Sequence, residues 1–139
     1  GGKWNYDADN RESPDLSLTV PKPTAFTPDA ITAEVLDLVA ARCADHFGDL
    51  DDFGFAVTRA QALAVLDGFI AERLPLFGTY QDAMIADEPW MYHSHIGFYL
   101  NAGLLRPAEA VRAAEGRSGK AGCCSVESIC AAARCSISA

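Results

Sequence analysis

The amino-acid sequence predicts a mainly α-helical protein, and three observations support this fold class. Apolar residues recur at the three- and four-residue spacing of a helix in several segments. Capping residues and prolines stand where those segments would begin. No segment shows the strict apolar–polar alternation that is typical of a β-strand. The chain has 139 residues, half of them hydrophobic, which is enough apolar material for the core of one domain.

Residues 1–26 are expected to form an extended connector that lies over another part of the molecule. The segment is rich in polar residues. Its three prolines each remove a backbone donor and disfavour a helix. They are Pro14, Pro21 and Pro23. Trp4 and Tyr6 are the expected docking points of this connector.

Residues 27–116 are expected to form a helical region. Its first helix is expected to begin with Thr27 as the cap, Pro28 at the first helical position and Asp29 near the positive end of the dipole. This helix is expected to run to about His46. The acidic loop that follows lacks the ligand order and the closing Glu of a calcium site. The apolar face of the helix comprises Ile31, Val35, Leu36, Leu38 and Val39.

The second helix is the best-defined element of the sequence. Thr58 and Gln61 have the spacing of a capping box, and Pro75 is expected to end the helix. The apolar stripe between them comprises Ala62, Leu63, Leu66, Phe69, Ile70 and Leu74.

Three shorter helical segments are expected farther along the chain. One is a turn of helix around residues 81–85, and another is a short helix near residues 96–101. The third begins at Pro107 and is expected to stop at Gly116.

Residues 117–139 form a tail of different composition, rich in Ser, Ala, Cys and Gly. Ser125 can cap a weak helix that runs to about Cys135. Four of the five cysteines fall in this tail, and the fifth is Cys43. The spacings in the tail are not the C-x₂-C pairs of a zinc or redox site, so no metal site is expected. The tail cysteines are Cys123, Cys124, Cys130 and Cys135.

The charge balance disfavours some classes of partner. The formal net charge is −8, from 19 acidic and 11 basic residues, and such a field opposes polyanions. We therefore do not expect the chain to bind DNA strongly by itself. No apolar run approaches the 18 or so residues of a membrane span, and the first residues do not resemble a signal peptide. A cytoplasmic protein, or a piece of one, is expected.

Residues 92–107 carry the main candidate site. A Tyr-His-Ser cluster stands there before a helix, and the N-terminus of a helix can hold an anion such as a phosphate. Ser94 offers a hydroxyl, and both His93 and His95 can donate hydrogen bonds. Tyr80 can add a phenolic donor from the preceding segment.

Three other interpretations of this segment remain open. Ser94 can simply cap its helix while the histidines are ordinary surface or core groups. A hydrolase would use Ser94 as its nucleophile, but the Gly-x-Ser-x-Gly elbow is absent. A zinc site would need ligands from distant positions, since His46 is the only other histidine.

Several unusual strings follow one another in a fixed order and spacing. They are GGKWNYDADNR, PDAIT, DHFG, VTR, LFGTYQDAM and YHS…LNAGLLRP. Together they resemble the prokaryotic (6-4) photolyases, also called iron–sulfur bacterial cryptochromes or photolyase-related proteins, over roughly residues 1–115. In that family an α/β antenna domain precedes a connector and a helical domain that holds FAD and a [4Fe–4S] cluster. The resemblance implies the connector and the first part of the helical FAD-binding domain.

The resemblance also implies a set of FAD-binding positions. The wider family holds the FAD diphosphate with a Thr-Ser-Arg-Leu-Ser string before a helix and with an upstream Tyr. The close family has a second Ser and a Pro at positions where this chain has Gly97 and Phe98. That difference removes one hydroxyl and loosens the start of the helix. The corresponding positions here are Tyr80, His93, Ser94, His95, Ile96 and Gly97.

The similarity weakens in the tail. A Ser/Asn-Val-Glu-Gly-Phe-Ile-Arg-Gln helix follows in the family, and only residues 125–127 echo it here. The cysteines that bind the family's cluster lie well beyond this length. The resemblance therefore implies no cluster ligand among the tail cysteines.

The expected function is that of a fragment of a photolyase- or cryptochrome-like flavoprotein. In the full-length family, the resemblance implies light-driven repair of (6-4) pyrimidine photoproducts flipped out of DNA, or blue-light sensing. Damaged DNA is the implied partner, and FAD is the implied cofactor. The chain alone is expected to be inactive as a DNA lyase. The alternative is a small helical interaction module without a bound cofactor.

Overall fold

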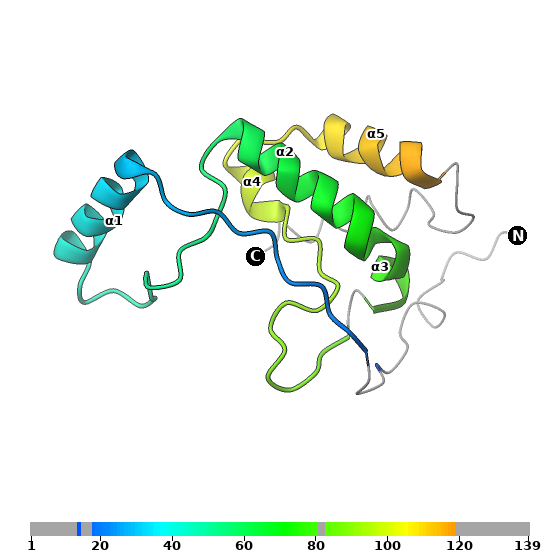
Figure 1. The fold of residues 1–139 in the computed structure, drawn as a ribbon, viewed down its shortest axis with the longest axis horizontal. Coiled ribbons are helices and arrows are strands. Elements are labelled where there is room, and N and C mark those ends of the chain that lie inside the picture. Colours follow the sequence, from blue (N-terminus) through cyan, green and yellow to red (C-terminus); the bar gives the residue numbers. More distant parts are fainter. Residues whose placement is uncertain (1–13, 15–17, 81–82, 119–139) are drawn as a thin grey trace, which may run out of the picture.

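A computed structural model describes residues 14, 18–80 and 83–118, and these residues are mainly helical, as the sequence predicts (Figure 1). Within these ranges the structure has no β-strand, and Ile85 and Glu88 form an isolated bridge. The predicted weak helix in the tail and the docking points Trp4 and Tyr6 lie outside the described residues.

Helix α1 spans Ala30–Arg42 and starts later than predicted. Its cap is Asp29, whose carboxylate accepts a hydrogen bond from the Thr32 N–H at 2.8 Å. The prediction of Thr27 as the cap was wrong because Asp29 reaches the free N–H groups of the first turn. The helix also ends before His46, since Cys43 already has a non-helical backbone.

Helices α2 and α3 form one continuous path through a π-helical turn. Helix α2 spans Arg59–Gly68, the turn η1 spans Phe69–Arg73, and α3 spans Leu74–Tyr80. The predicted capping box is confirmed, because Gln61 N–H donates to Thr58 Oγ1 and Thr58 N–H donates to Gln61 Oε1. This cap fixes the direction in which the path leaves the preceding loop.

The prediction that Pro75 ends the second helix was wrong. Proline lacks an N–H, and its ring collides with the carbonyl four residues earlier in a regular α-helix. The wider turn η1 comes directly before it, and the Leu74 N–H bonds to the Phe69 carbonyl five residues back. The path therefore continues through Pro75 to Tyr80.

The two remaining helices follow a non-helical segment. The turn of helix predicted at residues 81–85 was wrong for residues 83–85, which are not helical, and residues 81–82 lie outside the described part. Helix α4 spans Gly97–Asn101, close to its predicted bounds. Helix α5 spans Pro107–Ser118, beginning at Pro107 as predicted and passing through the expected stop at Gly116.

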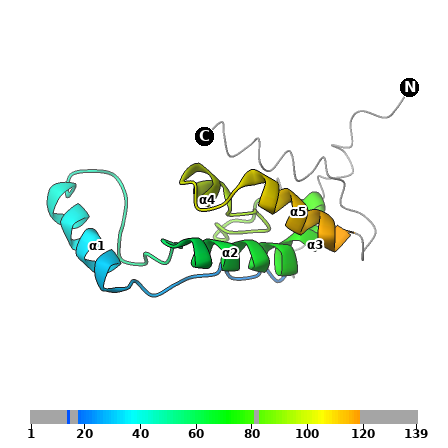
Figure 2. The ribbon, with the colours of Figure 1, turned by 90° about the horizontal axis from the view of Figure 1, so that it is seen from above.

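The core lies between the α2–η1–α3 path and the pair α4 and α5 (Figure 2). Five of the six predicted stripe residues of the second helix are buried there, and Leu63 packs against them. Tyr99 and Leu105 enter the core from the other side. Helix α1 lies to one side of this body (Figures 1 and 2).

Residues 18–26 have no helical or strand structure and run alongside the α2–η1 path (Figure 1). Three hydrogen bonds attach it. Tyr92 Oη donates to the Thr19 carbonyl at 2.9 Å, Arg73 Nη2 donates to the Pro21 carbonyl at 2.5 Å, and Phe26 N–H donates to the Gly54 carbonyl at 3.0 Å. These bonds hold the connector against the rest of the molecule, so it can form one wall of a cavity.

Candidate functional site

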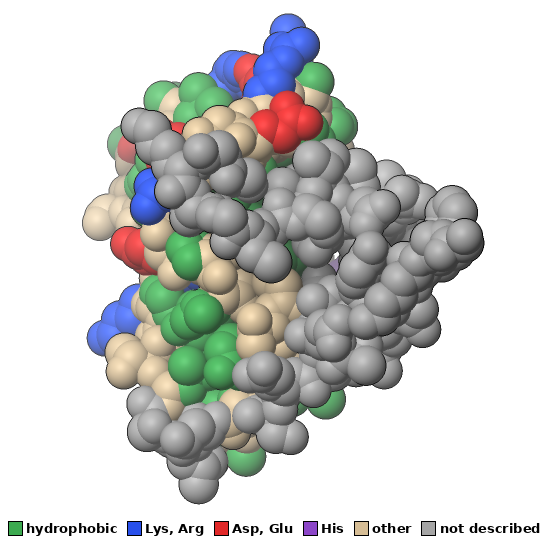
Figure 3. Space-filling model, turned by 90° about the vertical axis from the view of Figure 1, so that its right-hand side faces the viewer, with side chains coloured by type: hydrophobic (Ala, Val, Ile, Leu, Met, Phe, Trp, Pro, Cys, Tyr) green, Lys and Arg blue, Asp and Glu red, His purple; other side chains and the backbone are tan. Residues whose placement is uncertain are grey.

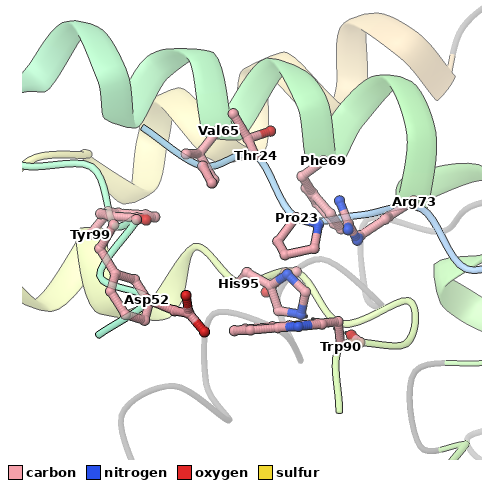
Figure 4. A pocket seen from close by; sticks show the side chains of 13 residues that line it. Pro23, Thr24, Asp52, Val65, Phe69, Arg73, Trp90, His95 and Tyr99 are labelled. Carbon is pink, nitrogen blue, oxygen red and sulfur yellow. Dashed lines mark hydrogen bonds between the residues drawn. The ribbon is translucent and has the colours of Figure 1, made fainter. Parts of the chain in front are cut away.

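A cavity of about 170 Å³ lies where the connector, the α2–η1 path and the segment before α4 meet (Figure 4). Its walls are mainly apolar and include Pro23, Val65 and Phe69. Its polar lining comes from Asp52, Arg73, Trp90, Ser94 and His95. Apolar walls with a few convergent polar groups are typical of ligand sites.

Arg73 lies at the end of η1 and is only 3% exposed. Its Nη2 donates to the Pro21 carbonyl, and its Nε has no hydrogen-bond partner among the described residues. Burial lowers the pKa of its guanidinium, while nearby Glu72 and Tyr92 oppose that shift. An arginine remains charged under such conditions, so the cavity has a cation on its wall.

His95 faces the same cavity with an unusual backbone, at a φ of 54°. Its Nε2 lies 2.8 Å from the Trp90 carbonyl, so Nε2 carries the proton and donates. Burial lowers the pKa of His95, and the positive charges of Arg73 and His93 lower it further, against the Trp90 hydrogen bond. The ring is therefore neutral near pH 7. Its Nδ1 is a buried acceptor without a partner among the described residues.

Ser94 lines the cavity beside His95. One alternative from the sequence was that Ser94 caps the following helix. Ile96 is the cap residue of α4 instead, and no side chain makes a capping hydrogen bond there. The Ser94 hydroxyl is therefore not used as a helix cap.

The structure brings Ser94 and His95 together at the cavity but leaves the other predicted residues outside its lining. Tyr80 stands at the end of α3, with its ring centroid 5.8 Å from that of Tyr92. The ring centroid of His93 lies 6.3 Å from that of His95, and the two ring planes are tilted by 55°. Ile96 belongs to the hydrophobic core, and Gly97 is the first residue of α4.

Sequence reasoning missed Arg73 and Trp90. Arg73 stands between Ile70 and Leu74, the last two residues of the apolar stripe. A cation at a core position of an amphipathic helix was the available signal, because an arginine is rarely buried unless a partner or a ligand pairs with it. Trp90 carried no comparable signal.

The described residues offer no group of three or more His, Cys, Asp or Glu side chains that could hold a metal ion. Cys43 is a free thiol, and the other four cysteines lie outside the described part. The described helices are too short or too polar to cross a membrane.

Comparison with known proteins assigns the class. Residues 1–55 match the family described as deoxyribodipyrimidine photo-lyase-related protein. This match and the relative described next support a fragment of a photolyase-related protein, as the sequence strings suggested.

A curated relative makes the relationship more specific. The (6-4) photolyase of Agrobacterium fabrum (strain C58 / ATCC 33970) is 48% identical over 115 residues, which is 83% of this chain. An uninterrupted stretch of that length must include residues 25–115, so Arg73, Ser94 and His95 lie within the matched region. The chain spans 23% of the length of that relative.

The residues at the cavity fit one polar group of FAD, the family's expected cofactor. A buried arginine with a free Nε and the Ser94 hydroxyl are suitable donors for a phosphate oxygen. The cavity volume is below the roughly 300 Å³ at which ligand pockets usually begin, so the complete dinucleotide is too large for it.

Proposed function

We propose that this chain supplies part of the FAD site of a photolyase-like flavoprotein, with Ser94, His95 and Arg73 holding a phosphate group. The observation that carries the proposal is the buried Arg73 with a free Nε at the cavity that Ser94 lines. No ion pair joins Arg73 to a carboxylate of the described residues. A buried cation is costly, and an anionic ligand would reduce that cost.

The other predicted residues take secondary roles in this proposal. Ile96 and Gly97 would offer backbone N–H groups next to the Ser94 hydroxyl. His93 would add positive charge when protonated, and Tyr80 would contact a more distant part of the cofactor. The exposed carboxylate of Asp52 lies on the cavity wall and would disfavour a second anionic group there (Figure 4).

The activity we propose belongs to the longer protein and not to this chain alone. FAD would supply light-driven electron transfer there. We infer that the longer protein acts in the cytoplasm on (6-4) photoproducts in damaged DNA, or senses blue light. The net charge of −8 supports a DNA-binding surface outside these 139 residues.

A flavin titration tests the proposal. The purified full chain is mixed with FAD, and binding is followed by flavin absorbance near 450 nm (roughly, as for oxidised flavin) and by quenching of flavin fluorescence. We expect saturable binding that Ser94→Ala and Arg73→Gln weaken about tenfold, because each removes a phosphate donor. Thr79→Ala is the matched control, since it removes a hydroxyl from α3 outside the cavity.

Two additions make the titration decisive. Arg73→Lys keeps a cation in the buried position and should retain more affinity than Arg73→Gln, provided both variants show the wild-type circular dichroism spectrum. A colourless protein that takes up no FAD, or equal affinities for wild type and Ser94→Ala, would contradict the proposal. That result would favour the alternative, a small helical interaction module without a cofactor.

A further inference from the structure

The apolar stripe of α1 faces solvent. Ile31 is 73% exposed and Leu38 is 49% exposed, although both belong to the regular apolar pattern of the helix. The four exposed members share one face, since they are three, four or one residues apart. A contiguous apolar face of this kind is typical of a binding surface. The stripe comprises Ile31, Val35, Leu38 and Val39.

The body of the molecule does not cover this stripe. Thr32 is the one buried residue of α1, and it lies on a different side of the helix from Ile31. The helix extends away from the other helices in two perpendicular views (Figures 1 and 2). The stripe is therefore presented as a separate surface.

The surrounding charges indicate what kind of partner fits. Residues 29–52 contain seven Asp and Glu residues but one arginine, Arg42. Glu34 lies beside the stripe, three residues after Ile31 and four before Leu38. A second copy of the chain, or an anionic lipid surface, would meet this acidic set with like charge. The charges favour an apolar segment flanked by lysine and arginine.

The family relationship indicates where such a segment comes from. The chain spans 23% of the Agrobacterium relative, so more than three quarters of that protein has no counterpart in the matched stretch. On the side of the molecule opposite α1, hydrophobic side chains also reach the surface (Figure 3).

We propose that the α1 stripe docks a basic-flanked amphipathic helix from the part of a photolyase-related protein that lies outside the matched stretch. The helix would lie in contact with α1. The proposal rests on the family part of the proposed function and not on the FAD site. A protein that does not bind FAD would therefore not contradict docking at α1. A protein that does not bind the peptides would not contradict the FAD proposal.

The test uses the full 139-residue chain and labelled peptides of about 25 residues that tile the unmatched part of the Agrobacterium relative. Fluorescence anisotropy measures binding. We expect a peptide with a Lys- and Arg-flanked apolar stripe to bind, and added salt to weaken it. The double variant Ile31→Ser/Leu38→Ser should weaken binding about tenfold or more.

Leu76→Ser is the matched control. Leu76 is 39% exposed, close to Val39 at 37%, but it stands on α3 at the other end of the molecule (Figure 1). It should leave peptide binding unchanged. Thermal unfolding should be the same for wild type and the α1 double variant, because the replaced side chains are already exposed.

Three outcomes would overturn the proposal. One is that none of the peptides binds. Another is that Ile31→Ser/Leu38→Ser and the control Leu76→Ser bind the peptide with equal affinity. The third is a concentration-dependent dimer, seen by sedimentation, that Ile31→Ser/Leu38→Ser dissolves, since the stripe would then bind a second copy.

Discussion

At the scale of single residues, the chemistry concentrates on two side chains that end with unused polar atoms. Within the described part of the chain, Arg73 has a donor without an acceptor, and His95 has an acceptor without a donor. A phosphate satisfies Arg73 directly, but it meets a bare lone pair at His95 Nδ1. The histidine must therefore take up a proton before it can donate to the same anion.

The buried His95 should make the stability of the protein depend on pH. The pKa of His95 is lowered in the folded protein, so the unfolded chain binds more protons below the ordinary value of about 6.5. The free energy of unfolding should therefore fall as the pH drops below that value. The fall should end once the pH is below the lowered pKa of His95 in the folded protein. Urea unfolding at a series of pH values measures it.

His95→Asn is the control for this effect. Asparagine tolerates the positive φ of this position and does not titrate. The variant should lose less stability between neutral and mildly acidic pH than the wild type does. Equal pH slopes for the two proteins would contradict the prediction. In the presence of FAD, proton uptake on binding should appear in calorimetry with buffers of different ionisation enthalpy.

At the scale of elements, the connector depends on close backbone contact. The Phe26 N–H donates to the Gly54 carbonyl, and a Cβ at Gly54 would lie 3.0 Å from the Ala25 Cβ. At Gly68 a Cβ would lie 2.9 Å from Thr24 Oγ1. Two glycines, one in a loop and one in a helix, therefore leave the space in which the connector lies.

Replacing one of these glycines should loosen the connector. Gly54→Ala forces its new methyl group against the Ala25 backbone and side chain, and we expect a loss of about 1–3 kcal/mol in the free energy of unfolding. Gly116→Ala is the matched control, because nothing lies within 4 Å of its Cβ and it stands in α5. The control should gain up to about 1 kcal/mol. Chemical denaturation compares the two, and equal stabilities would count against a tightly packed connector.

At the scale of the whole molecule, the local elements were more predictable than the site. The capping box at Thr58 and the start of α5 at Pro107 depend on neighbouring residues, so the sequence pattern suffices for them. The helix continues past Pro75 because the Leu74 N–H bonds to the carbonyl of Phe69, five residues earlier. Helix propensities of single residues do not predict such a bond. The cavity joins the connector, the loop near Gly54, η1 and the segment before α4, which are far apart in the chain. Ser94 was identified from the polar cluster before a helix and again from the family string, whereas Arg73 was missed although it is a cation within an apolar stripe.

The whole chain should not repair DNA by itself. It spans 23% of its (6-4) photolyase relative, and its cavity of about 170 Å³ is too small for complete FAD. Illumination of the purified chain with reduced FAD and an oligonucleotide that contains a (6-4) photoproduct should leave the lesion unchanged, as measured by chromatography. The Agrobacterium relative is the positive control. Light-dependent loss of the lesion with this chain alone would refute the prediction.

The π-helical turn η1 also sets the direction of a side chain at the cavity. A π-helical turn takes more residues than an α-helical turn, so it can absorb one extra residue, whereas the same residue added to a regular α-helix would rotate every later side chain by about 100°. Arg73 closes that turn, so its direction depends on the number of residues before it as well as on its own identity. The length of the segment 69–73 is therefore part of what forms this wall of the cavity.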